Sequence, residues 1–256
     1  YEFGFKCGGP FAIGFSAWIH DKCKKEKIEK VLFTSRDGYT LKLIYDKLYC
    51  DIPSEYTLWS HSIAAKVSAK NFPHYFNNLL LYERSDHGYY DKNKVVEELK
   101  QFRIQCISSQ NINQYEELIQ YVTDHMEEMI DALNEEEKAV KKYYRGVIGA
   151  NKKIACVDIG WTGMNFKTLK EAVESRCLLA GLVPQSRNVV PVKVNEFDKD
   201  VFIYSPIINT EQMNFFMEKA SEYPYFYEIL SGAPHAAIYD VGENNIGGYE
   251  FMFNIP

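Results

Sequence analysis

Apolar residues along the chain follow two different periodicities, which separate candidate strands from candidate helices. Short, uninterrupted apolar runs bounded by turn residues are typical of strands buried in a parallel sheet. Such runs occupy 31–34, 56–59, 154–158, 178–183 and 201–204. Apolar positions repeated every three or four residues predict helices at 11–24, 41–48, 165–174 and 211–222, with another through Ala64 and Ala65. This alternation predicts an α/β fold with a mostly parallel sheet flanked by helices.

One long segment interrupts the alternation. Residues 71–149 are acidic, show helical spacing and contain no strand pattern. We therefore expect an α/β core domain formed by 1–70 and 150–256, with 71–149 as an all-helical insertion or lid. The apolar stripe from Leu118 to Leu133 is expected to pack in a core or an interface.

Composition and net charge limit the functional classes to which this protein can belong. The chain is 46% hydrophobic and 25% charged, as in an ordinary globular protein, and its net charge of −6 argues against general nucleic-acid binding. No apolar stretch approaches the roughly 20 residues of a membrane span, and we expect no signal peptide. Six cysteines without a CxxC pair favour reduced thiols in the cytoplasm. The chain opens mid-pattern and stops just after a strand-like stretch, 249–255, so we expect one domain of a longer polypeptide.

Two strand–turn–helix units, 31–38 and 154–163, carry most of the functional information. In each, an apolar run stops at a charged residue and a glycine, and an amphipathic helix follows. In an open α/β sheet such junctions lie at the carboxyl ends of the strands, where ligands bind. The turn amides and the helix N-terminus there suit a phosphate. We predict that the two turns open side by side onto one pocket that holds a phosphorylated substrate at both ends.

The later turn contains Asp158, Gly160, Trp161, Thr162 and Gly163. A carboxylate at a strand end can accept hydrogen bonds from two sugar hydroxyls, so Asp158 is a candidate catalytic residue, together with Arg36 and Asp37 of the earlier turn. The other four are candidates for binding substrate and its terminal phosphate, because glycine lets the backbone approach closely. Alternatively, Asp158 caps the following helix.

The earlier turn contains Ser35, Arg36, Asp37 and Gly38. The Arg36 guanidinium is suited to a fork-like grip on a phosphate, and Ser35 and Gly38 are candidate phosphate-binding residues. Asp37 would orient Arg36 or bind Mg²⁺ indirectly, through a diphosphate that carries the metal. In the structural alternative, Ser35 and Asp37 are helix N-caps and Arg36 is a surface ion-pair partner.

Further candidates carry weaker signals. Ser60 and His61 follow the second strand and would approach a phosphate, although a helix-capping serine with an exposed histidine is the alternative. Glu228, Ser231 and His235 would contact an acceptor or act as a general base. A histidine beside a proline is also a common turn residue.

The string from Asp158 to Gly163 resembles the ribose-phosphate loop of type I phosphoribosyltransferases, where a strand ends in two acids and Thr-Gly follows before a helix. Asp158 stands at the second acid, and Val157 replaces the first. The resemblance implies a Rossmann-like, phosphoribosyltransferase-like sheet and a donor such as phosphoribosyl diphosphate with bridging Mg²⁺. It also implies transfer through an oxocarbenium-like state without a protein nucleophile.

Over nearly the full length outside the helical insertion, a second resemblance appears in the segments 1–19, 30–46, 156–172 and 225–240. They look like a bacterial polysaccharide-associated family labelled as predicted haloacid-dehalogenase-superfamily hydrolases and found with glycosyltransferases in capsule and O-antigen loci. The resemblance places this chain after the family's phosphatase-like motifs. It implies a sugar-phosphate donor, a glycan acceptor and attached or co-operonic glycosyltransferase or phosphatase domains, which would hold the protein in the cytoplasm or at the inner face of the membrane.

Three functions follow from these patterns. The leading hypothesis is a phosphoribosyltransferase-like transferase that acts on an activated phosphorylated sugar in capsule or O-antigen synthesis. The second is a non-catalytic glycan-recognition or scaffold domain. The third is a divergent haloacid-dehalogenase-like phosphatase. In the register of that superfamily's motif, however, Ser35 stands where the nucleophilic aspartate belongs and Tyr39 where the threonine belongs.

Overall fold

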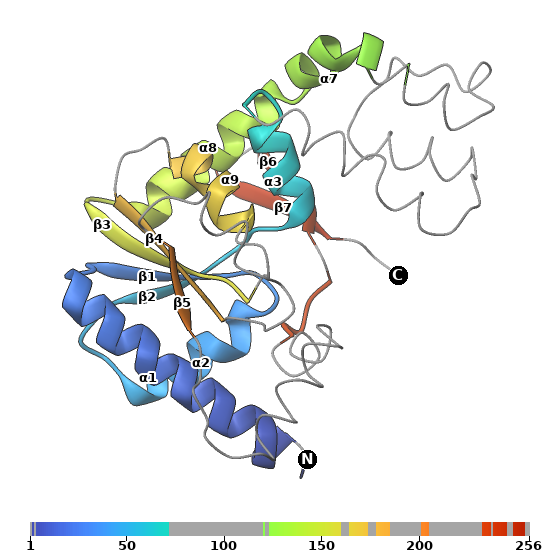
Figure 1. Ribbon diagram of the computed structural model, residues 1–256. Coiled ribbons are helices and arrows are strands. Elements are labelled where there is room, and N and C mark those ends of the chain that lie inside the picture. The colour runs from blue at the N-terminus through green and yellow to red at the C-terminus, as the bar shows by residue number, and fades with distance from the viewer. Residues whose placement is uncertain are drawn as a thin grey trace. The chain divides into compact units, whose positions relative to one another are not determined.

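The computed structural model describes residues 2, 4–71, 120, 123–159, 164–173, 178–184, 201–204, 232–236, 238–244 and 248–253. The chain divides into two compact units. The first combines 1–59 with 145–237 and contains a parallel sheet. The second combines 60–144 with 238–256 and contains helices and a hairpin (Figure 1).

A five-stranded parallel sheet forms the centre of the first unit, in the order β2-β1-β3-β4-β5. The strands are β1 (Lys30–Thr34), β2 (Ser54–Thr57), β3 (Lys153–Val157), β4 (Leu178–Pro184) and β5 (Val201–Tyr204). The α/β class with a parallel sheet and flanking helices is therefore confirmed. Strand β1 pairs with both β2 and β3, so the direction of strand addition reverses there.

Helices cover the sheet of the first unit on both faces. They are α1 (Gly9–Glu26), preceded by the π-helical turn η1 (Gly4–Gly8), then α2 (Gly38–Leu48) and α9 (Met164–Val173). Figure 1 shows α1 and α2 on one face and α9 on the other. Right-handed crossovers explain the split, because the chain steps from β1 to β2 in one direction and from β3 to β4 in the other. No helix among the described residues is long and apolar enough to cross a membrane.

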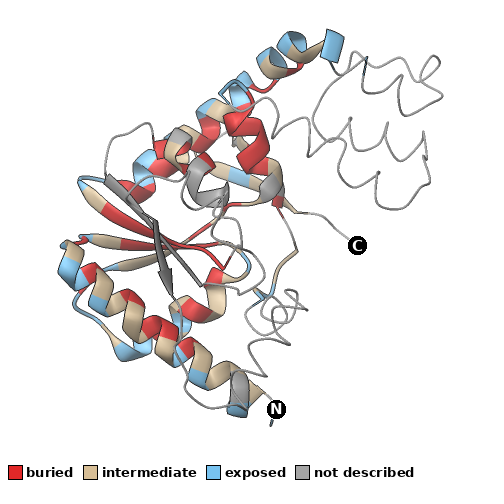
Figure 2. Ribbon diagram, in the orientation of Figure 1, coloured by how far each residue is buried: buried red, intermediate tan, exposed pale blue. Residues whose placement is uncertain are grey.

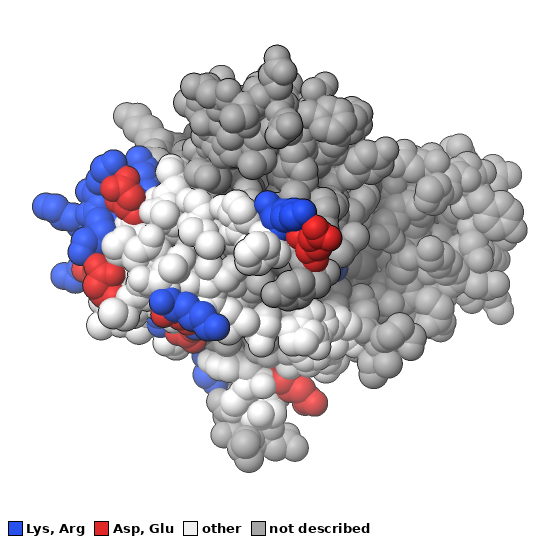
Figure 3. All heavy atoms as spheres, turned by 90° about the horizontal axis from the view of Figure 1, so that it is seen from below, with Lys and Arg blue, Asp and Glu red and all other residues white. Residues whose placement is uncertain are grey.

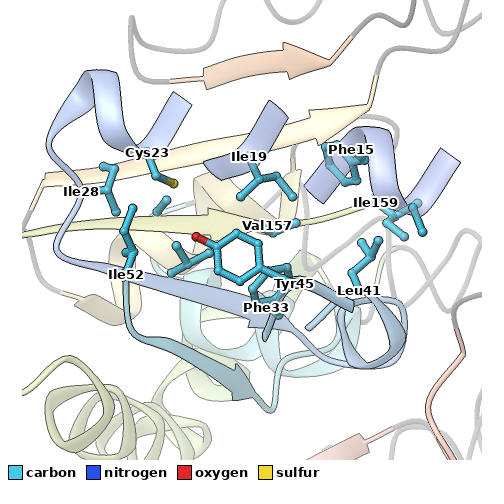
Figure 4. Close-up of a cluster of buried hydrophobic side chains, with 13 residues drawn as sticks. Phe15, Ile19, Cys23, Ile28, Phe33, Leu41, Tyr45, Ile52, Val157 and Ile159 are labelled. Atoms are coloured by element: carbon cyan, nitrogen blue, oxygen red, sulfur yellow. The ribbon is translucent and has the colours of Figure 1, made fainter. Parts of the chain in front are cut away.

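The hydrophobic core of the first unit lies between the sheet and the helices α1 and α2 (Figures 2 and 4). Phe15 and Ile19 of α1 are fully buried, as their helical spacing predicts, and Phe33 of β1 packs with them in the same cluster. Tyr45 of α2 lies in the middle of this cluster, with its ring 5.4 Å from that of Phe33. The predicted helices at 11–24 and 41–48 are thus the two that close this core.

The second unit contains α3 (His61–Ser68), α7 (Met126–Ala132), most of α8 (Asn134–Ile148) and the antiparallel hairpin of β6 (Ile238–Glu243) and β7 (Tyr249–Phe253). Helix α3 contacts β6, and Tyr143 of α8 packs edge-to-face on Tyr249 and Phe251 of β7. The unit boundaries therefore differ from those expected. The second unit also includes α3 and the C-terminal hairpin. The expected insertion contained neither, because it ran from 71 to 149 and had no strands. The predicted helix at 211–222 lies outside the described residues.

Seen from below, basic and acidic side chains lie next to one another in a few groups on a largely uncharged surface (Figure 3). Lys25 pairs with Asp21 at 2.7 Å within α1. Asp51, in the loop before β2, receives Lys24 at 2.8 Å and lies 2.7 Å from Nε2 of His20. These contacts, with Lys24 first and His20 second, lower the pKa of Asp51 to about 2. The basic side chains named here are paired with acids.

The Tyr45 hydroxyl provides a test of core packing. The side chain is fully buried, burial raises its pKa, and the hydroxyl has no hydrogen-bond partner within the described part of the chain. A buried, unbonded hydroxyl is destabilising, so Tyr45→Phe should raise the free energy of unfolding by about 1 kcal/mol in urea denaturation. The control Tyr45→Ala should lower it by about 3–5 kcal/mol because it leaves a cavity. A clear loss in Tyr45→Phe would show that the hydroxyl is bonded.

Acid sensitivity tests the cluster at Asp51. Lys24 and His20 bind its ionised form in the folded state, so the lowered pKa stabilises the protein above the ordinary carboxyl pKa, and this is lost as the pH falls from about 4 towards 2. Asp51→Asn should therefore be less stable than the wild type at pH 6, and the difference should shrink towards pH 2. Denaturation curves across this range measure the difference. Asp21→Asn, which removes an exposed pair within one helix, should show little effect at any pH.

Candidate functional site

The carboxyl ends of β1, β2 and β3 meet at one edge of the sheet. Phe33 of β1 is opposite Tyr56 of β2 on one side and Val157 of β3 on the other. In open α/β sheets, ligands bind where the strand order reverses, between two strands whose following helices lie on opposite faces. Here those two strands are β1 and β3. The structure thus brings the first residues of the two predicted turns side by side.

Two buried threonines tie these strand ends together. The hydroxyl of Thr57, at the end of β2, donates to the carbonyl of Phe33 at 3.4 Å. The hydroxyl of Thr34, at the end of β1, donates to the carbonyl of Val157 at 2.8 Å. Both threonines are almost fully buried, so these bonds are shielded from water. They hold the starts of the Ser35–Gly38 turn and of the Asp158 turn in fixed register.

The turn after β1 has an unusual backbone. Arg36 has a φ of 64°, in the left-handed region that residues other than glycine seldom adopt. Its amide donates to the hydroxyl of Tyr56 at 2.9 Å, and its carbonyl accepts from the amide of Tyr39 at 3.2 Å. The left-handed conformation costs about 1–2 kcal/mol, and strain of this kind clusters at functional sites. The Arg36 side chain is exposed at this edge of the sheet.

The neighbours of Arg36 do not act as helix caps. The Ser35 hydroxyl accepts from the amide of Trp59 at 3.0 Å and donates to the carbonyl of the same residue, so it fastens the segment after β2. Asp37 occupies the N-cap position of α2, but its side chain makes no capping hydrogen bond, and its Oδ1 is shielded from solvent. Gly38 is the first residue of α2 and is buried against the backbone of Phe33. Ser35 is therefore not the N-cap of α2, and Asp37 holds that position without a side-chain capping bond.

Asp158 directly follows β3 and is only 6% exposed. Its Oδ2 is shielded from solvent. Burial, and after it the charge of Asp158, raise the pKa of the Cys156 thiol well above its usual value. Because α9 begins at Met164, Asp158 does not occupy the N-cap of that helix. Gly160, Trp161, Thr162 and Gly163 lie outside the described residues.

His235 reaches the turn after β1 through Tyr56. Nε2 of His235 lies 2.7 Å from the Tyr56 hydroxyl, and Nδ1 lies 2.8 Å from the carbonyl of Ala236. The sequence analysis singled out His235 but not Tyr56. The signal that could have indicated Tyr56 was its position in the sequence. It is the next-to-last residue of β2, a strand whose carboxyl end lies beside that of β1. Glu228 and Ser231, grouped with His235 in that analysis, lie outside the described residues.

Ser60 and His61 belong to the second unit. Ser60 is the N-cap of α3, and its hydroxyl accepts from the amide of Ile63 at 3.1 Å. The capping alternative for Ser60 is therefore the one that the structure shows. The side chain of His61 lies outside the described part of the chain.

The edge offers charged groups suited to a phosphorylated ligand. Arg36 supplies a guanidinium, and Asp37 and Asp158 supply carboxylates. Among the described residues, no group of three or more His, Cys, Asp or Glu side chains is placed to hold a metal ion. Mg²⁺ commonly takes one or two protein carboxylates and completes its shell with phosphate oxygens and water. Asp37 is a suitable ligand of that kind for a metal that arrives with a diphosphate.

Comparison with known proteins adds no relatives: no protein-family model matches the chain, and no curated protein matches it. The interpretation of the site therefore rests on its residues. They are an exposed arginine in a left-handed turn and, on the neighbouring strand end, a nearly buried carboxylate.

A substitution at Gly38 tests how closely the start of α2 approaches the backbone of β1. A Cβ at this position would lie 2.8 Å from the carbonyl carbon of Phe33, which is backbone and cannot move aside alone. Gly38→Ala should lower the free energy of unfolding by about 2 kcal/mol in urea denaturation. Gly146→Ala is the matched control, because a Cβ there meets nothing within 4 Å and the residue is exposed within α8. That control should be neutral or stabilise by about 0.5–1 kcal/mol. Equal effects at both positions would contradict the close approach.

Proposed function

We propose that this edge of the sheet binds an activated, phosphorylated sugar and that the protein is a phosphoribosyltransferase-like transferase in capsule or O-antigen synthesis. One observation carries the proposal. The two turns predicted to hold opposite ends of the ligand begin on adjacent parallel strands, joined by the bond from Thr34 to Val157, where the strand order reverses. The same order, 2-1-3-4-5, is one of the common doubly wound, Rossmann-like arrangements, which supports the finer fold assignment.

Each part of the ligand has a candidate partner. The Arg36 guanidinium and the Gly38 amide would bind the diphosphate, with Asp37 as a ligand of the Mg²⁺ that it carries. Asp158 would accept hydrogen bonds from the sugar hydroxyls. The terminal phosphate would lie against the turn from Gly160 to Gly163. The acceptor would be a glycan, and attached or co-operonic glycosyltransferase or phosphatase domains would be partners in the cytoplasm.

The chemistry would be mainly electrostatic. Transfer of the sugar separates a positively charged, oxocarbenium-like centre from a negatively charged diphosphate. A fixed guanidinium stabilises the departing negative charge, and a fixed carboxylate near the sugar stabilises the developing positive charge. Neither role requires a covalent intermediate on the protein.

The phosphatase alternative receives less support. It requires a nucleophile at the position of Ser35. The Ser35 hydroxyl instead donates to and accepts from the backbone of Trp59, which makes it a structural link between the β1 turn and the segment after β2.

Isothermal titration with phosphoribosyl diphosphate and Mg²⁺ tests the proposal. The wild-type protein should bind, and Arg36→Gly should bind at least about tenfold more weakly, because it loses a charge-assisted, two-pronged contact. Glycine adopts the left-handed conformation without strain, so this variant should keep or raise the melting temperature. Arg145→Ala, which removes an exposed arginine from α8, should bind like the wild type.

The outcomes separate the hypotheses. Absence of binding at millimolar ligand would exclude this donor. Binding without transfer to any glycan acceptor would leave the recognition-domain hypothesis. Unchanged affinity in Arg36→Gly would remove Arg36 from the site even if the donor binds elsewhere.

A further inference from the structure

We propose that Tyr56, held by His235, is a positioning residue on the leaving-group side of the site, an inference that rests on the proposed function. The sequence analysis placed His235 on the acceptor side. The hydrogen bonds and the strand order instead connect it to the turn that would hold the diphosphate.

The direction of each hydrogen bond follows from the atoms involved. A backbone carbonyl only accepts, so Nδ1 of His235 must carry the proton that it shares with the carbonyl of Ala236 at 2.8 Å. In the neutral ring, Nε2 is then the acceptor and the Tyr56 hydroxyl donates to it at 2.7 Å. The Tyr56 oxygen in turn accepts from the amide of Arg36 at 2.9 Å. All three bonds run in one direction, from the Arg36 amide through the Tyr56 hydroxyl and the His235 ring to the carbonyl of Ala236.

This chain of bonds orients the Arg36 turn. Arg36 has the left-handed φ of 64°, and its amide donates to the Tyr56 oxygen at 2.9 Å. The Tyr56 ring is itself fixed by an edge-to-face contact with Tyr39, with the ring centroids 5.5 Å apart, and by His235 at 5.9 Å. Tyr56 therefore holds the backbone from which the Arg36 guanidinium projects.

The strand order indicates whether Tyr56 and His235 lie near the leaving group or near the acceptor. Across the edge, Asp158 follows β3, the Arg36 turn follows β1, and Tyr56 lies on β2, with neighbouring strands about 4.8 Å apart. A sugar at Asp158 and a diphosphate at the Arg36 turn would point the leaving group towards β2. In a single displacement the acceptor attacks from the face opposite the leaving group. The acceptor would then approach from the side away from β2. Tyr56 and His235 lie on the β2 side and therefore would not contact the acceptor.

The experiment uses two probes, inorganic diphosphate with Mg²⁺ and ribose 5-phosphate, titrated into the full chain. Tyr56→Phe should weaken diphosphate binding about fivefold to tenfold, the effect expected for losing one orienting hydrogen bond. Its affinity for ribose 5-phosphate should stay within about twofold of the wild-type value. Tyr49→Phe is the matched control. It removes a tyrosine hydroxyl just after α2, at the opposite edge of the sheet, and should bind both probes like the wild type.

A measurement on the wild-type protein does not depend on how the variant folds. Nitrogen NMR of labelled histidine should show His235 protonated at Nδ1, with Nε2 accepting a hydrogen bond. Saturation with diphosphate should shift the Nε2 signal, whereas ribose 5-phosphate should leave it unchanged. A tyrosine with a purely structural role would not transmit diphosphate binding to His235.

The results distinguish this inference from the proposed function. If the wild type binds neither probe nor phosphoribosyl diphosphate, the proposed function fails and the inference with it. If the wild type binds both probes but Tyr56→Phe weakens both equally or neither, the inference alone is overturned. A His235 signal that responds to ribose 5-phosphate and not to diphosphate would return His235 to the acceptor side.

Discussion

The structure of the candidate site depends on the pairing of β1 with two parallel neighbours. Because β2 and β3 both lie beside β1, their carboxyl ends finish at one edge, and the chain can bring side chains from distant segments to that edge. The bonds from Thr57 to Phe33 and from Thr34 to Val157 continue this pairing to the last residue of β2 and β1. Everything proposed for the turns assumes that their starting points do not shift relative to one another, and these buried bonds provide that constraint.

Much of the sheet and of the core could be predicted from the sequence, because buried parallel strands are short apolar runs and helices repeat their apolar positions every three to four residues. The strand β6 was missed because Ile238–Glu243 contains Asp240 and Gly242, which weaken a strand pattern. The boundaries of the two units were also beyond prediction. They depend on contacts such as Tyr143 with Phe251, which no local pattern reveals.

The site shows the same division between local and distant information. Arg36, Asp37 and Asp158 could be proposed from the sequence because a charged residue and glycine after an apolar run mark the end of a buried strand. Tyr56 could not be proposed in the same way, because its hydrogen bond is to His235, which lies 179 residues further along the chain. The left-handed conformation of Arg36 was equally hidden. The residue that a sequence predicts at such a position is glycine or asparagine, and arginine carries no signal for it.

Locally unfavourable arrangements of residues help to distinguish a candidate functional site from a compromise in core packing. Arg36 has a left-handed backbone conformation, which costs free energy, and Asp158 is a carboxylate almost excluded from water; both lie at the same edge of the sheet. Natural sequences tend to concentrate such departures at functional sites. Tyr45 is a contrasting case, since its buried hydroxyl is also unfavourable but lies within the apolar cluster beneath α1 and α2. A single departure inside a core is a packing compromise. An arginine and a carboxylate on adjacent strand ends, with the arginine turn fixed by a tyrosine and a histidine from elsewhere in the chain, are the features on which the proposed ligand site rests.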